Sequence, residues 1–199
     1  MQLQRVATDA LELRGQFHIA VPGGSVANLV FPSFADASLD WTRVHVWWVD
    51  ERVVPLSHAD SNYKAANDHW LSKVPAVAHP FHSASEYEKK LPHPLDVALL
   101  GVGPDGHVAS LFPGHPGLEE TARRAFAIDD APKPPPKRLT LSLPELCAAR
   151  EVWVVVTGAA KAPMIASAMR PDSPLPVARV LREASYVRLW LDPAAAAQL

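Results

Sequence analysis

Residues 96–113 read DVALLGVGPDGHVASLFP, an apolar run that passes directly into a loop with three glycines. The run from Asp96 to Leu100 predicts a buried strand, and a short helix is expected to follow the loop. Glycine has no Cβ, so a ligand can approach such a loop closely. In open α/β sheets, ligands bind just beyond the carboxyl ends of the strands. We therefore expect this loop to carry the chemistry and His107 to be the side chain that it presents.

Three other apolar runs also end in polar or glycine-rich turns. In chain order, residues 17–21 end at Gly23-Gly24-Ser25, residues 41–49 end at Asp50-Glu51-Arg52, and residues 151–157 end at Gly158, before a helix with Lys161 in its first turn. A last strand is expected at 186–191. Because helical segments separate the strands, we expect an α/β fold: a mostly parallel, Rossmann-like sheet with helices on both faces, in one domain spanning residues 1–199.

The remaining segments are expected to be helices and connectors. A connector with one short helix is predicted at 74–95, and an extended proline-rich stretch at 131–138 should lead into a strand at 139–143. A ligand for a proline-binding domain is the alternative for that stretch. Helices are predicted at 26–34 (weakened by Pro32), 63–73 after the capping run Asp60-Ser61-Asn62, 85–91, 118–124, 144–150 and 193–199.

Composition limits the function classes. The 199 residues are 48% hydrophobic and 20% charged, which is ordinary for a globular protein. The net charge of −2 argues against a basic nucleic-acid surface. The single Cys147 excludes an internal disulfide, and no signal-peptide core or membrane-length apolar run is present. We expect a cytoplasmic monomer with neither nucleic-acid nor membrane partners.

The chemistry-bearing residues should meet at one edge of the sheet, because the carboxyl ends of parallel strands lie together. A glycine turn at a helix start offers free N–H groups to an anion, and an arginine can grip a phosphate with two hydrogen bonds. His107 supplies a base near neutral pH. Each feature has an alternative interpretation. The turn at Gly23-Gly24-Ser25 could bind no ligand, Asp50-Glu51-Arg52 could be a solvated turn with an internal ion pair, and Lys161 could be a surface side chain. His79 and His82 lack the further ligands of a metal site, so no metal is expected.

Six runs agree in order and composition with one known family. They are Gly23-Gly24-Ser25; Asp50-Glu51-Arg52 with Val54-Pro55; Asp60-Ser61-Asn62-Tyr63; residues 99–113; Arg138-Leu139-Thr140-Leu141; and Thr157-Gly158 with Lys161-Ala162. From about Phe17 to the C-terminus the chain resembles the 6-phosphogluconolactonases, in the superfamily that also holds glucosamine-6-phosphate isomerases. It departs from the family at Pro22, Val26 and Ala27, and it looks shorter at the N-terminus and in the 74–95 connector.

The resemblance implies hydrolysis of the δ-lactone of 6-phosphogluconate, in the pentose phosphate pathway, without a cofactor. It implies that Arg52 and Lys161 hold the phosphate with the Gly24-Ser25 turn. The expected substrate-binding residues are Gly23, Gly24, Ser25, Asp50, Arg52, Asn62, Gly103, Gly106, Arg138 and Lys161. The expected catalytic residues are His107, which would activate water, and Asp105, which would fix the tautomer of His107. Backbone N–H groups from Gly103 to Gly106 would bind the oxyanion.

Two other functions stay open from the sequence. A sugar-phosphate isomerase or deaminase of the same fold would usually use an acidic base, which the run Asp105-Gly106-His107 does not favour. A non-catalytic sugar-phosphate-binding paralogue would leave the lactone to its uncatalysed rate. A nucleophilic esterase is less favoured, because Ser25 and Ser110 lack a Gly-x-Ser-x-Gly elbow.

Overall fold

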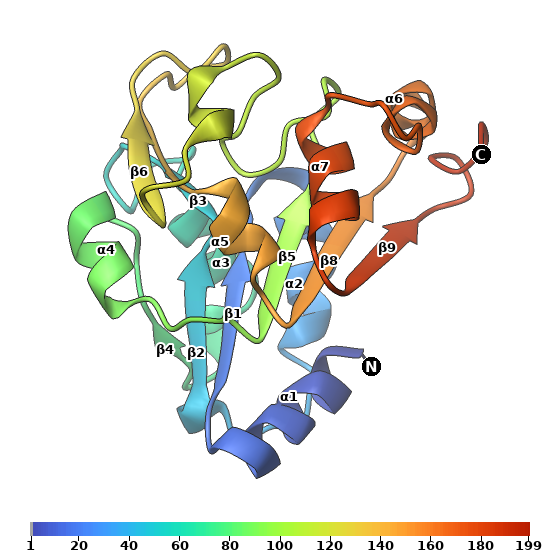
Figure 1. The fold of residues 1–199 in the computed structure, drawn as a ribbon. Helices are drawn as coiled ribbons and strands as arrows, with labels where there is room; N and C mark the ends of the chain where they lie inside the picture. The colour runs from blue at the N-terminus through green and yellow to red at the C-terminus, as the bar shows by residue number, and fades with distance from the viewer. Residues whose placement is uncertain (1) are drawn as a thin grey trace.

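A six-stranded parallel sheet forms the centre of the computed structural model, which describes residues 2–199 (Figure 1). The strand order is β4-β2-β1-β5-β8-β9. The strands are β1 (Phe17–Val21), β2 (Val44–Trp48), β4 (Val77–Ala78), β5 (Val97–Gly101), β8 (Glu151–Val156) and β9 (Val187–Leu191). The central strand β5 is apolar along its length because both faces of the sheet are covered.

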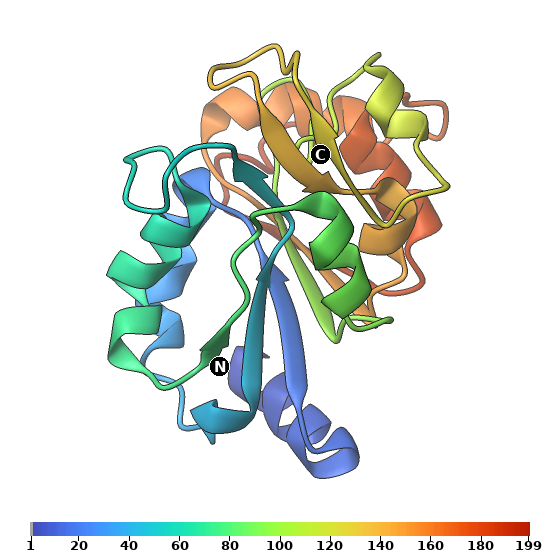
Figure 2. The same ribbon diagram turned by 90° about the vertical axis from the view of Figure 1, so that its left-hand side faces the viewer.

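Helices cover both faces of this sheet (Figure 2). On one face lie α2 (Gly24–Phe34) and α3 (Asn62–His69), and on the other lie α4 (Ala84–Lys90), α5 (Leu143–Cys147) and α7 (Pro176–Glu183). The first helix, α1 (Gln2–Arg14), lies at the end of the sheet where the strands begin, and α6 (Ala162–Ala168) follows β8. Within residues 2–199, no helix has the length and apolar composition needed to cross a membrane.

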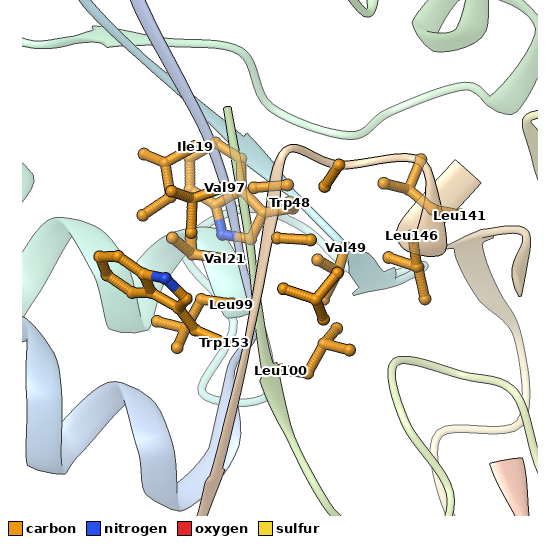
Figure 3. Packing of buried hydrophobic residues seen from close by; sticks show 14 of the residues in the cluster. Ile19, Val21, Trp48, Val49, Val97, Leu99, Leu100, Leu141, Leu146 and Trp153 are labelled. Carbon is orange, nitrogen blue, oxygen red and sulfur yellow. The ribbon is translucent and has the colours of Figure 1, made fainter. Parts of the chain in front are cut away.

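Buried side chains fill the space on both sides of β5 (Figure 3). Leu99 and Leu100 are 1% and 0% exposed, and consecutive residues of a strand point to opposite faces. Leu99 lies near Trp153 of β8, whereas Leu100 lies on the side of Leu141 and Leu146. The sheet is therefore a rigid base whose carboxyl ends can hold loops in fixed positions.

A small antiparallel sheet stands beside the carboxyl ends of the main sheet. It has the order β3-β7-β6 and consists of β3 (Asp50–Arg52), β7 (Arg138–Leu141) and β6 (Ala125–Ile128). Arg52 of β3 lies opposite Arg138 of β7 in the register. Asp50-Glu51-Arg52, expected as the polar tip of the preceding strand, form a separate strand of the small sheet, and β6 was not predicted.

The α/β prediction is confirmed, whereas several helix predictions are wrong. No helix follows the glycine loop: Ala109 has a φ of +49°, which a right-handed helix does not allow, and Val108 forms isolated bridges to Val102 and Leu111. Residues 41–43 form a short 3-10 turn before β2 rather than the start of the strand. Neither α1 nor β4 was predicted, although the buried residues of α1 recur at helical spacing, at Leu3, Val6, Ala7, Ala10 and Leu11.

Polar side chains explain the other differences. The predicted helix at 118–124 is a 3-10 turn over Pro116–Glu119, after which Glu120 accepts the N–H groups of Ala122 and Arg123 and turns the chain towards β6. The predicted helix at 63–73 begins at the expected cap, Ser61, but its α-helical part ends at His69. Residues 193–198 form turns rather than the predicted helix, although Asp192 accepts the N–H of Ala195 as a helix cap would.

Candidate active site

The loops that follow β1, β5 and β8 meet the small sheet around one hollow of about 200 Å³. Ten of the twelve predicted site residues line it, and they come from segments far apart in the chain. The lining residues are Pro22, Gly23, Gly24, Ser25, Val26, Asp50, Arg52, Asn62, Gly101, Val102, Gly103, His107, Ala109, Arg138 and Lys161. Asp105 and Gly106 are not among them.

His107 and Asp105 form a close pair at the hollow. The Nδ1 atom of His107 lies 2.5 Å from Oδ1 of Asp105, and its ring is tilted against Phe112. Burial lowers the pKa of His107, while Asp105 opposes that shift. Burial alone would raise the pKa of Asp105, but hydrogen bonds from His107 and Lys133 hold it below its usual value. With Nδ1 donating to Asp105, Nε2 of a neutral His107 is the free acceptor.

Gly103 makes room for this pair. A Cβ on Gly103 would lie 2.0 Å from Cε1 and Nδ1 of His107 and 2.6 Å from Oδ1 of Asp105. Those distances are far below van der Waals contact. The close approach of the loop backbone, and not an unusual φ, is therefore what requires glycine at this position.

The backbone N–H groups of Gly103 and Gly106 were expected to bind the oxyanion, but both are hydrogen-bonded within the loop. The N–H of Gly103 donates to the carbonyl of His107, and the N–H of Gly106 donates to the carbonyl of Gly103. Gly106, with a φ of +81°, packs against Leu175 and accepts the N–H of Val177 through its carbonyl. Gly106 therefore shapes the loop and does not face the hollow.

Cationic groups and a helix start border the hollow. Arg52 donates through NH1 to the carbonyl of Asp60 at 2.7 Å, while its buried Nε has no hydrogen-bond partner among residues 2–199. Lys161 donates to the carbonyl of Val102, and burial lowers the pKa of its ammonium. Gly24 and Ser25 open α2, whose first N–H groups have no acceptor within the helix.

Asp50 and Asn62 line the hollow and are hydrogen-bonded to each other. Nδ2 of Asn62 donates to Oδ1 of Asp50 at 3.1 Å, and Oγ of Ser110 donates to Oδ2 of Asp50 at 2.6 Å. Oδ1 of Asn62 lies so close to Gly23 that a Cβ there would be 1.8 Å away. Both oxygens of Asp50 thus accept a hydrogen bond, and these bonds orient Asn62 and Ser110; substrate binding by Asp50 stays a prediction.

Glu51 supports the same region, and the sequence analysis assigned it no role. It is 3% exposed and accepts the N–H groups of Asn62 and Tyr63 at 2.7 and 2.8 Å, at the start of α3. Burial raises the pKa of Glu51 despite these hydrogen bonds. Its place between Asp50 and Arg52 is the signal that the sequence offered.

Arg138 lines the hollow and also holds the neighbouring loop. Its Nε donates to the carbonyl of Pro135 at 3.0 Å, and NH2 donates to the carbonyls of Lys133 and Pro134 at 3.2 and 3.4 Å. Its guanidinium therefore fixes the proline-rich loop, and direct substrate binding by Arg138 stays a prediction.

Lys133, which sequence reasoning missed, lies beside the His107–Asp105 pair. Its Nζ atom lies 3.3 Å from Oδ1 of Asp105 and 3.5 Å from Nδ1 of His107. The surrounding prolines predict the backbone conformation of this stretch, but they do not predict that Lys133 lies beside Asp105. The proline-rich segment from Ala131 to Arg138 ends in β7, as the sequence predicts.

The histidines away from the glycine loop have another arrangement. His79 lies against His45, with 2.9 Å between Nε2 of His79 and Nδ1 of His45. In the part of the chain that the structure describes, no three His, Cys, Asp or Glu side chains are grouped as metal ligands.

Comparison with known proteins gives consistent results. The family model described as glucosamine-6-phosphate isomerases/6-phosphogluconolactonase matches residues 1–190. A probable chloroplastic 6-phosphogluconolactonase 3 from Oryza sativa subsp. indica is 38% identical, over 98% of this chain and 70% of that protein. A 6-phosphogluconolactonase from Mycobacterium bovis is 37% identical, over 96% of this chain and 88% of that protein. The solved 6-phosphogluconolactonase from Trypanosoma brucei is similar with a TM-score of 0.87 at 28% identity, covering 100% of this chain and 92% of that one.

Proposed function

Because the chain belongs to the glucosamine-6-phosphate isomerase/6-phosphogluconolactonase family, we propose that its hollow binds 6-phospho-D-glucono-1,5-lactone, with His107 as the base and Arg52 and Lys161 as phosphate ligands. The enzyme hydrolyses this lactone to 6-phospho-D-gluconate in the pentose phosphate pathway, the activity of relatives that are 36–41% identical. The family resemblance inferred from the sequence is thereby confirmed.

The observation that carries the proposed roles is the His107–Asp105 pair beside a cationic hollow. Nε2 of neutral His107 accepts a proton from water while the water oxygen attacks the lactone carbonyl carbon. The bond between that carbon and the ring oxygen then breaks, and the imidazolium returns the proton to the ring oxygen. Asp105 accepts from Nδ1–H throughout, so it keeps the ring oriented and stabilises its transient positive charge.

The phosphate is assigned to Arg52, Lys161 and the start of α2. Arg52 has an unpartnered Nε among the described residues, and the first N–H groups of α2 are available to an anion. Lys161 adds a second cation from the loop after β8. Holding the phosphate at a fixed distance from His107 orients the lactone for attack and so raises the rate as well as the affinity.

The sugar-phosphate isomerase alternative gains nothing from the site, because the group placed for proton transfer is an imidazole. A purely binding role would not explain the close orientation of Nδ1 of His107 by Asp105. We also propose that the enzyme acts as a cytoplasmic monomer that does not bind nucleic acid. Its single cysteine and its net charge of −2 support this, and light scattering should give a mass near 21.6 kDa.

A kinetic comparison of two variants tests the residue roles. Release of 6-phosphogluconate from freshly prepared lactone is measured against the spontaneous rate. We expect His107→Asn to lower kcat by about 100-fold or more, since general-base catalysis contributes about that much, and to leave product binding nearly unchanged. Arg52→Ala should instead raise KM about tenfold, the effect of losing one charge-assisted contact.

The two variants control for each other. Both should give wild-type circular dichroism, so that a loss of activity reports on the site and not on folding. A His107→Asn enzyme with near-normal turnover would remove His107 from the role of base. An Arg52→Ala enzyme with unchanged KM would remove Arg52 from the phosphate site.

A further inference from the structure

The proline-rich loop delivers a third cation, Lys133, to the catalytic pair. Its ammonium and Nδ1 of His107 both approach the same carboxylate oxygen, Oδ1 of Asp105, at 3.3 and 2.5 Å. Lys133 does not line the hollow, in contrast to Arg52 and Lys161. Its position therefore matches contact with the base and its carboxylate rather than contact with the phosphate.

The backbone of Lys133 is fixed by a buried anchor. Arg138 is 4% exposed, and its guanidinium donates to three consecutive carbonyls, those of Lys133, Pro134 and Pro135. NH1 of Arg138 also lies 3.5 Å from Oγ of Ser110. Prolines restrict the loop further by fixing φ. The backbone at Lys133 is therefore held rigidly, although the Lys133 side chain is 40% exposed.

The charges that face His107 come from three segments. Asp105 and Asp50 favour the imidazolium, whereas Lys133 and burial of the ring disfavour it. Phe112 contributes an apolar surface to the same ring. Lys161 faces Asp105 and Lys133 from the loop after β8. Of these groups, only Lys133 is a cation that both touches Asp105 and opposes protonation of His107.

We propose that Lys133 is a positioning residue of the lactonase reaction, which holds the Asp105 carboxylate against Nδ1 of His107 and opposes early protonation of that ring. This inference rests on the proposed function. A fixed Asp105 keeps the tautomer in which Nε2 is the acceptor for the proton of water. The nearby positive charge keeps that Nε2 unprotonated until the water oxygen attacks the lactone.

Two substitutions at Lys133 and one nearby control test this role. Lys133→Met removes the charge, Lys133→Arg retains it, and Lys137→Met removes an exposed lysine at the other end of the same loop. We expect Lys133→Met to lower kcat about tenfold with KM within about twofold of wild type, because positioning rather than binding is lost. Lys133→Arg should recover most of kcat, and Lys137→Met should behave as wild type.

The pH dependence adds a readout that a purely structural role would not move. Removing Lys133 removes a repulsion from the imidazolium, so the acid limb of the kcat/KM profile should move to higher pH. The same upward shift should appear in the NMR titration of His107 without substrate. A raised KM with unchanged kcat would instead make Lys133 a phosphate ligand, and unchanged kcat and titration would remove it from the site; either result overturns the proposal.

The outcomes separate this inference from the proposed function. If wild-type enzyme did not accelerate lactone hydrolysis, the proposed function would fail. The His107 titration would still report whether Lys133 acts on the His107–Asp105 pair. If wild type were active and Lys133→Met titrated like it, only the inference about Lys133 would fail.

Discussion

Gly103 is the residue on which the geometry of the His107–Asp105 pair depends. A methyl group there would occupy the position of the His107 ring edge, at 2.0 Å from two ring atoms. The ring would have to turn away from Asp105 and lose its fixed tautomer. A residue with no side chain is thus as necessary to the proposed reaction as the base itself.

The first prediction follows from this crowding. Gly103→Ala should lower kcat by at least tenfold, since small misplacements of a catalytic group have large costs. Gly117→Ala is the matched control, because its Cβ would also be crowded, at 2.9 Å from Phe126, but outside the hollow. Steady-state kinetics of both variants decide the matter. Equal kcat values for the two variants would show that crowding at Gly103 is harmless.

Sequence reasoning found the site residues that directly follow apolar strands and missed those whose role depends on tertiary contacts. His107 and Lys161 were predicted because a strand end and a glycine precede each of them. Lys133 was not, because only the tertiary fold brings the proline loop to Asp105. Arg138 was predicted by resemblance, whereas its hydrogen bonds to the loop carbonyls depend on the tertiary fold.

At the scale of elements, three histidines connect neighbouring strands. His18 of β1 and His45 of β2 lie opposite each other with their rings stacked at 4.6 Å, and His79 follows β4. Trp47 stacks on His79 with 3.9 Å between ring centroids. Burial, His45, His18 and Lys90 lower the pKa of His79 to about 4. Burial and neighbouring charge also lower the pKa of His18.

This cluster predicts a loss of stability in acid. The unfolded chain takes up a proton on His79 near pH 6.5, whereas the folded protein does so only near pH 4, so the free energy of unfolding falls as the pH drops between these values. His79→Gln should reduce that loss by about 1 kcal/mol, a value discounted for the partial exposure of the ring. Urea unfolding at pH 7 and pH 4.5 measures it.

The exposed His82 lies in the same connector and provides the control. With His82→Gln, the free energy of unfolding should fall between pH 7 and pH 4.5 by the same amount as in the wild type. If His79→Gln and wild type lost the same free energy between pH 7 and pH 4.5, the histidine cluster would not be a source of acid sensitivity.

Sequence patterns found the parallel strands but not the small sheet. Strands β5 and β8 are largely continuous apolar runs, and such runs predict buried strands. Strand β3 consists of Asp50, Glu51 and Arg52, whose polar side chains predict a turn. It becomes a strand only because β7 pairs with it, and that partner lies more than eighty residues later in the chain.

Across the whole molecule, Asp96 joins the elements at the end opposite the hollow. It is 4% exposed, and its carboxylate accepts the N–H of His18 at 2.8 Å and Nε of Arg14 at 3.0 Å. Arg150, just before β8, approaches it at 3.5 Å. One carboxylate thus connects α1, β1, β5 and the start of β8.

Removing this carboxylate should weaken the fold without changing the chemistry. Asp96→Ala leaves a buried N–H and two arginines without their partner, and we expect it to destabilise the protein by about 3 kcal/mol. The kcat of the folded fraction should stay at the wild-type value. Asp172→Ala, which breaks an exposed pair with Arg170, should cost less than about 0.5 kcal/mol. Denaturant unfolding of both variants, with activity measured below the transition, tests this; equal midpoints for the two would contradict it.

The pairing of Arg52 with Arg138 across β3 and β7 places two parts of the proposed site on one small sheet. Arg52 is assigned to the phosphate, and Arg138 anchors the loop that carries Lys133 to the His107–Asp105 pair. A change in the register of this sheet would therefore displace the phosphate ligand and the support of the base together.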